Sequence, residues 1–132
     1  MNITYQINAA VTAEAVAEVF RTSGIRRPVD DLARIQQMLD HGNLTLTAWD
    51  GDQLVGISRS LTDFCFCCYL SDLAVRGEYQ RQGIGRELVR LTYEQLGSDV
   101  MLLLIAAPEA NEYYPHIGFE KQERAWYIPR RT

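Results

Sequence analysis

The residues best suited to bind a charged ligand lie in one short segment, Gln80-Arg81-Gln82-Gly83-Ile84-Gly85-Arg86. It follows an apolar stretch that predicts a buried strand, and it opens an amphipathic stretch that predicts a helix with its first turn at residues 83–86. The first amides of a helix have no partners within it, and the macrodipole leaves partial positive charge there. Two glycines remove the side chains that would keep a ligand away, and two arginines add cationic donors. The spacing predicts a cradle for a diphosphate.

Two other phosphate-binding motifs do not fit this segment. A Rossmann fingerprint requires a third glycine, and Leu88 stands at that position. A P-loop requires Gly-Lys-Ser/Thr after the turn, which the sequence lacks. A lone Gly-x-Gly also occurs in tight connections that merely pack a helix on a strand, so the rest of the chain has to support the cradle.

The hydrophobic pattern predicts the elements that position this turn. Strands are expected at residues 2–8, 44–49, 54–61, 67–75, 100–106, 119–123 and 124–128. Helices are expected at residues 13–22, from Asp30 to Gly42, at residues 86–96, and briefly after Pro108. Because one helix lies between the strands at 67–75 and 100–106, these strands form a parallel β-α-β unit. The sequence predicts one α/β domain over residues 1–132, with a mixed, mostly antiparallel sheet and flanking helices.

The glycine-rich turn resembles motif A of the GCN5-related N-acetyltransferase (GNAT) superfamily, Gln/Arg-x-x-Gly-x-Gly/Ala, which reads here Gln80-x-x-Gly83-x-Gly85. A second stretch, residues 110–119, is similar to the family's Ala-x-x-Phe-Tyr-x-x-x-Gly-Phe, with Tyr113 at the phenylalanine position. Two separate motifs in the family's order are more specific than either alone. The sequence departs from the family at Gly77, where proline is common, and at Ala107, where asparagine is common.

The resemblance implies an acetyl-CoA-dependent N-acetyltransferase that acts on a primary amine of a small molecule or a protein. It implies that the strand backbone binds the pantetheine arm and that the following amides bind the diphosphate. It further implies a β-bulge on the 67–75 strand and a separation from the 100–106 strand. The implied cofactor-binding residues are Leu73, Ala74, Val75, Arg81, Gln82, Gly83, Ile84, Gly85 and Arg86. Two alternatives remain open: a non-catalytic acyl-CoA-binding regulatory module and a nucleotide-binding regulatory domain.

The resemblance also implies that Tyr114 is the general acid, since the family commonly has a catalytic tyrosine there. A phenol with a pKa of about 10 can protonate an alkyl thiolate, whose conjugate acid has a pKa of about 8.5. The family frequently places a glutamate or histidine base at the positions of Tyr69 or Ser71, and neither side chain is a strong base. We expect these two residues to line the substrate site, on the strand face that alternation assigns to Leu73 and Val75. Asp72 is expected on the opposite face unless a bulge re-aims it.

The acceptor site is expected to be built from residues 22–31 between the first two helices, the start of the hairpin strands and the C-terminal strands. Arg26 and Arg27 could pair an acidic acceptor there, although surface arginines are commonly just solvated. The acceptor's identity does not follow from the sequence, because loops of this kind vary.

The composition also bears on the binding partners, the cellular location and the presence of a metal site. The formal net charge of −4 disfavours nucleic acid as the main partner, and no window of about 18 apolar residues predicts a membrane span. The start of the chain lacks a signal-peptide pattern, so the expected location is the cytoplasm. Cysteines 65, 67 and 68 have no nearby histidines, which favours buried reduced thiols over a metal site. A homodimer is possible by analogy with the family.

Overall fold

The computed structural model describes residues 2–132. Its strands and helices follow the order β-α-α-β-β-β-α-β-α, with short 3-10 helices before α3 and before α4. The elements are β1 (Ile3–Ile7), α1 (Ala13–Ser23), α2 (Leu32–His41), β2 (Leu44–Asp50), β3 (Gln53–Thr62), β4 (Cys67–Val75), η1 (Gly77–Tyr79), α3 (Ile84–Glu94), β5 (Met101–Leu103), η2 (Pro108–Ala110) and α4 (Tyr113–His116).

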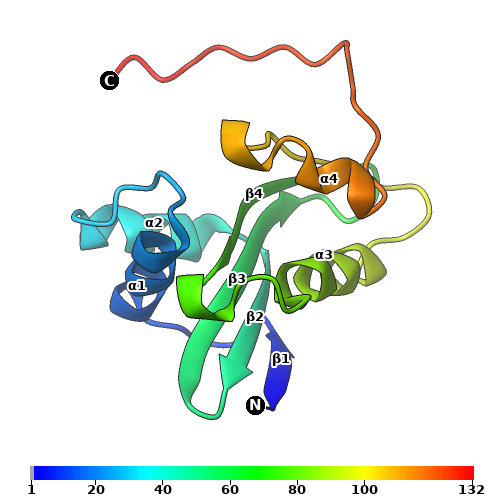
Figure 1. Ribbon diagram of the computed structural model, residues 1–132. Coiled ribbons are helices and arrows are strands. Elements are labelled where there is room, and N and C mark those ends of the chain that lie inside the picture. The colour runs from blue at the N-terminus through cyan, green and yellow to red at the C-terminus, as the bar shows by residue number, and fades with distance from the viewer. Residues whose placement is uncertain (1) are drawn as a thin grey trace.

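A five-stranded sheet in the order β1-β2-β3-β4-β5 forms the centre of the molecule. The first four strands pair antiparallel and β4 pairs parallel with β5, which confirms the predicted mixed sheet. Helices α1 and α2 cover one face, and α3 covers the other (Figure 1). These faces are called the α1/α2 face and the α3 face below.

Local sequence signals explain where the first two helices begin and end. The Thr12 hydroxyl accepts a hydrogen bond from the Ala15 amide and so caps α1, and Gly24 ends it in the left-handed conformation, with φ of 87°. Asp31 caps α2 by accepting from the Arg34 amide. In α2, Leu32 is exposed because it lies in the first turn, whereas Ile35 is fully buried.

Each face of the sheet has its own apolar core. On the α1/α2 face, Phe20 of α1 and Ile35 of α2 pack with Ile57 and Ala74 of the sheet. On the other face, Leu88 of α3 packs in a second cluster. The full buried sets are Ala13, Val16, Val19, Phe20, Ile35, Leu54, Ile57 and Ala74 for the first core, and Leu44, Leu46, Ala48, Val55, Ile84 and Leu88 for the second.

Strand β4 contains a bulge at Ser71, as the family resemblance implied. Against β3, Asp72 is opposite Arg59 and Leu70 is opposite the next residue, Ser60, so Ser71 has no opposite residue of its own. A bulge of this kind interrupts the alternation of side chains between the two faces. Tyr69 therefore lies on the same face as Asp72.

The end of the chain differs from the sequence prediction. Strand β5 covers only Met101–Leu103 instead of residues 100–106, and Met101 and Ile105 are exposed, so it is not covered on both faces. The strands predicted at 119–123 and 124–128 do not form; this segment runs extended away from the sheet (Figure 1). Apolar residues suggested strands there, but three residues of β5 offer too short an edge for pairing. Trp126 consequently remains 92% exposed.

The cysteine prediction is correct for one of the three residues. Cys68 is buried, whereas Cys65 and Cys67 are exposed and all three are free thiols. The difference arises because residues 63–66 form a turn before β4. The Asp63 carboxylate accepts hydrogen bonds from the amides of residues 65, 66 and 67, which holds Cys65 in the turn and Cys67 at the exposed first position of β4.

Candidate active site

The turn between β4 and α3 has the backbone of an anion-binding loop. Arg81 has φ of 65° and Gly83 has φ of 85°, so two residues two positions apart are left-handed. Left-handed residues at such spacing turn successive amides toward one side and form concave anion sites. A left-handed arginine is also uncommon and costs free energy, which is typical of functional loops.

Several amides of this turn have no acceptor within residues 2–132. The first amide of α3 that donates to the chain is that of Glu87, which bonds to the carbonyl of Gly83 at 3.0 Å. The amides of Ile84, Gly85 and Arg86 precede it and remain available. An ideal Cβ at Gly83 would meet no atom within 4 Å, so the mouth of the helix is open.

The turn is fixed to the end of α1 by two contacts that sequence reasoning missed. A Cβ at Gly77 would lie 2.9 Å from the carbonyl oxygen of Thr22, so only glycine fits there without a shift. The Gln80 side chain donates through Nε2 to the carbonyls of Ser23, at 3.2 Å, and Val75, at 2.9 Å. Glycine thus replaces the family's common proline at 77 because α1 approaches closely.

Beside this turn, β4 loses its partner on one side. The β4–β5 ladder ends at the pair Tyr69–Leu103, and residues 70–75 of β4 pair only with β3. The two strands therefore separate, as expected. Residues 73–75 therefore have no partner strand on their β5-facing edge, between the bulge and the turn, although the Val75 carbonyl already accepts from Gln80.

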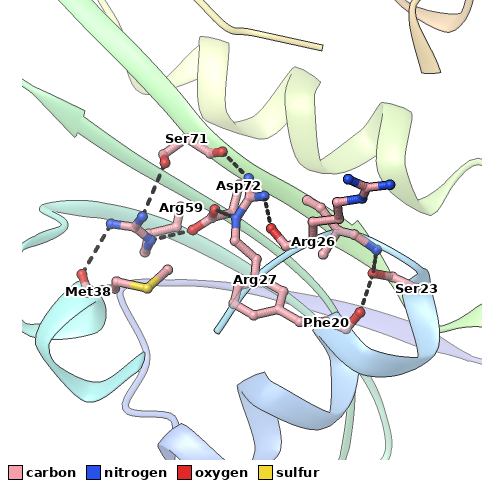
Figure 2. A network of polar contacts seen from close by, with 9 residues as sticks. Phe20, Ser23, Arg26, Arg27, Met38, Arg59, Ser71 and Asp72 are labelled. Atoms are coloured by element: carbon pink, nitrogen blue, oxygen red, sulfur yellow. Dashed lines mark hydrogen bonds and ion pairs between the residues drawn. The ribbon is translucent and has the colours of Figure 1, made fainter. Parts of the chain in front are cut away.

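A buried carboxylate lies at the bulge. Asp72 is fully buried, and its two oxygens accept from Nε of Arg27 and Nε of Arg59, each at 2.5 Å (Figure 2). These three residues are called the Asp72 cluster below. Arg27 reaches it from the loop between α1 and α2, and Arg59 reaches it from β3. Two arginines and one aspartate leave the cluster with a net charge of +1.

The cluster is also bound to the surrounding backbone. Arg27 donates to the carbonyls of Ser71, at 2.8 Å, and Arg26, at 2.6 Å. Arg59 donates to the carbonyl of Met38 in the last turn of α2, at 3.1 Å. Asp72 is thus a structural anchor, fully engaged by arginines, and is unsuited to take a proton from a substrate. Only Arg27, with its side chain 24% exposed, is open to solvent.

Tyr69 and Ser71 lie on a different face from the one predicted. Because of the bulge, Tyr69 is on the α1/α2 face, while Leu73 and Val75 remain on the α3 face. The Ser71 hydroxyl accepts from Nη2 of Arg59 at 3.2 Å, which places it on the α1/α2 face as well. The strict two-residue alternation was therefore wrong, but both residues are on the side of the α1–α2 loop.

The second motif folds the chain back over the site. Gly118 is left-handed, with φ of 100°, and turns the chain so that the Phe119 amide donates to the carbonyl of Tyr114 at 3.1 Å. The ring of Phe119 packs edge-on against Tyr114, with centroids 5.4 Å apart. Tyr113 also packs edge-on against Tyr114, at 5.3 Å. The motif's Gly-Phe pair thus explains how Tyr114 is held.

Burial raises the pKa of Tyr114, and the neighbouring Tyr113 adds to this. The positive charge of Arg27 acts in the opposite sense on the same hydroxyl. Burial likewise raises the pKa of Tyr113, and there the opposing charge is that of Arg86. Both phenols are therefore protonated at neutral pH and can donate.

Within residues 2–132, no helix is long and apolar enough to cross a membrane. In the same range, no group of three or more His, Cys, Asp or Glu side chains could hold a metal ion.

Comparison with known proteins gives consistent matches. The family model for the acetyltransferase (GNAT) domain matches residues 7–127. The uncharacterized N-acetyltransferase ycf52 of Gracilaria tenuistipitata var. liui is 24% identical over 129 residues, which cover 90% of this chain and 68% of that protein.

Solved structures agree with the sequence match. A probable acetyltransferase from meticillin-resistant Staphylococcus aureus has a TM-score of 0.79 and 22% identity, covering 98% of this chain and 100% of that chain. The aminoglycoside N-acetyltransferase AAC(6')-Iy in complex with CoA has a TM-score of 0.70 and 16% identity, covering 99% of this chain and 96% of that chain. At these identities the likeness shows the fold.

The mixed sheet, the turn between β4 and α3 and the matches to known proteins together define an α/β domain of the acetyltransferase type. The chain belongs to the acetyltransferase (GNAT) domain family, as the match over residues 7–127 shows.

Proposed function

We propose that the protein is an acetyl-CoA-dependent N-acetyltransferase that acts on a primary amine of a small molecule or a protein. One observation supports this above all: the free amides of Ile84, Gly85 and Arg86 lie in the turn and helix that follow the part of β4, residues 70–75, that has no partner in β5. Amides at a helix N-terminus favour a diphosphate, and an unpaired strand edge favours an extended amide-containing chain. CoA carries both groups. The structural neighbour solved with CoA supports the same cosubstrate.

The proposed cofactor site runs along the end of β4 and into the turn that follows it. The backbone of β4 from Leu73 to Val75 binds the pantetheine arm in the place of a strand. The turn from Arg81 to Arg86 binds the diphosphate through its amides and its arginine side chains. The residues in this role are Leu73, Ala74, Val75, Arg81, Gln82, Gly83, Ile84, Gly85 and Arg86.

Tyr114 is the proposed general acid. The acceptor amine attacks the thioester carbonyl, the C–S bond breaks, and the phenol of Tyr114 protonates the departing thiolate. A raised pKa keeps the phenol protonated for this step, and the charge of Arg27 stabilises the tyrosinate that results. The amine loses its own proton to solvent, because the one carboxylate at the bulge is bound by two arginines.

The acceptor binds on the α1/α2 face, beside the α1–α2 loop. Tyr69 and Ser71 line this side, since the bulge places both there. A cytoplasmic location and a homodimer stay predictions from sequence and family.

Both oxygens of Asp72 accept hydrogen bonds from arginines, so this carboxylate is not free to act as a base at the bulge. This observation favours a second candidate function, a non-catalytic acyl-CoA-binding module. Calorimetry with acetyl-CoA, followed by a free-thiol assay over a panel of amines, separates the two. An enzyme binds acetyl-CoA and releases thiol only when an amine is present. Binding without amine-dependent thiol release supports the module, and absence of CoA binding by the wild-type protein rejects both.

A further inference from the structure

Tyr113 places its hydroxyl against the first turn of α3. An ideal Cβ on Gly85, the second residue of α3, would lie 3.3 Å from the Tyr113 hydroxyl oxygen. The phenol of α4 therefore reaches across to the helix mouth that carries the free amides of the turn.

The two adjacent tyrosines of α4 serve different ends of the site. Tyr113 lies near the charge of Arg86 at the start of α3, whereas Tyr114 lies near the charge of Arg27 in the α1–α2 loop. Their rings are inclined at 76° to each other, with centroids 5.3 Å apart. One phenol is at the diphosphate end, and the other is at the end where the acceptor loop lies.

The Tyr113 hydroxyl has no hydrogen-bond partner in the described part of the chain, and its side chain is only partly covered, at 39% exposed. Around Gly85 the chain thus provides one phenol, several free amides and the guanidinium of Arg86. All of these groups can donate, and only the phenol oxygen can also accept. A set so rich in donors suits an anion with several oxygens.

We propose that Tyr113 is a cofactor-binding residue whose hydroxyl donates a hydrogen bond to the diphosphate of CoA on the first turn of α3. This inference rests on the proposed function. A phenylalanine at this position would preserve the packing against Tyr114 and lose the donor.

The test compares Tyr113→Phe with the wild-type protein against two probes. CoA carries the diphosphate and pantetheine lacks it. A hydrogen bond to a charged group contributes about 1.5–3 kcal/mol, so the dissociation constant for CoA should rise on the order of 10- to 100-fold in the variant. The dissociation constant for pantetheine, measured by protein-observed NMR because binding is weak, should stay the same. Tyr93→Phe, an exposed tyrosine on α3, is the matched control and should change neither constant.

The possible outcomes separate the two proposals. If the wild-type protein binds CoA and Tyr113→Phe binds it equally well, this inference fails and the proposed function stands. If Tyr113→Phe weakens CoA and pantetheine by the same factor, the hydroxyl acts on packing and not on the diphosphate, and the inference again fails. If the wild-type protein does not bind CoA, both are rejected.

Discussion

The Arg27 guanidinium donates from Nε to Oδ1 of Asp72 at 2.5 Å and so links the α1–α2 loop to the bulge of β4, 45 residues further along the chain. The carboxylate is fully buried and Arg59 holds its other oxygen. The shape of the acceptor side therefore depends on a buried ionic contact as well as on apolar packing.

Asp72→Asn should lower the free energy of unfolding by about 3–5 kcal/mol, because the buried Arg59 and the partly buried Arg27 would then lack a carboxylate partner. Urea denaturation measures the change. Glu94→Gln is the control: its pair with Arg90 is exposed on both sides, so it should change stability by less than about 0.5 kcal/mol. A loss below about 1 kcal/mol for Asp72→Asn would contradict the structural role.

Gly77→Ala should lower stability by about 1–3 kcal/mol, because the new Cβ would lie 2.9 Å from the carbonyl oxygen of Thr22. Thermal or urea unfolding gives the difference. Gly97→Ala is the matched substitution, since a Cβ there would meet no atom within 4 Å. Equal losses of stability at the two positions would show that the close approach of α1 to the turn does not restrict residue 77 to glycine.

Gly83→Ala should weaken CoA binding as well as lower stability. A left-handed φ costs an alanine about 1–2 kcal/mol, and the methyl group would project toward the proposed diphosphate site. Gly24→Ala carries similar strain, at φ of 87°, but lies at the end of α1. Calorimetry with CoA should therefore distinguish the two variants although their melting temperatures fall alike. Unchanged CoA affinity in Gly83→Ala would place the diphosphate elsewhere.

Tyr114→Phe should reduce kcat by about 10²–10⁴-fold with little change in CoA affinity, because only the proton donor is lost. Burial raises the pKa of this phenol, so its protonated form persists to a higher pH than in an ordinary tyrosine. The wild-type rate should accordingly fall only above about pH 10, and the variant should lack that basic limb. A variant with the full rate and the same pH profile would exclude Tyr114 as the acid.

Thr92→Val should cost more stability than Ser58→Ala. Their hydroxyls lie 2.9 Å apart in the buried contact between α3 and β3, and Thr92 donates its proton to the carbonyl of Leu88. Ser58 must then be the donor in the pair, and valine would leave that buried donor unsatisfied at about 1–3 kcal/mol. Removing Ser58 leaves Thr92 bonded and should cost about 0.5–1.5 kcal/mol. A larger loss of stability for Ser58→Ala than for Thr92→Val in urea denaturation would instead make Thr92 the donor in the pair.

Sequence patterns predicted the elements that depend on local signals. The strand expected at residues 67–75 has the bounds of β4, and the helix expected at residues 13–22 is α1, which is one residue longer. They follow from hydrophobic period, side-chain capping and backbone freedom, which neighbouring residues determine. The glycine-rich turn was located for the same reason.

Contacts between distant parts of the chain were not predicted. The Asp72 cluster joins residues 13 and 45 positions apart, and the only hint of it in the sequence was that β3 and β4 each contain a single charged residue. The faces of β4 were misassigned because register depends on the partner strand. The two final strands were wrong because apolar composition does not supply an edge with which to pair.

Ser71 also decides which face of the sheet the first half of β4 presents to each core. If this residue paired with β3 instead of bulging, strict alternation would make Tyr69 and Cys67 exchange faces with Leu70 and Cys68 while Asp72 and Ala74 stayed in place. Leu70 and Cys68 would then leave the α3 face and a tyrosine would enter it, although no residue had been changed. Deleting Ser71 would leave the faces as they are, because Leu70 and Asp72 already pair with the consecutive residues Ser60 and Arg59. Among related sequences, a strand that is one residue shorter at this position should therefore keep the same pattern of buried residues.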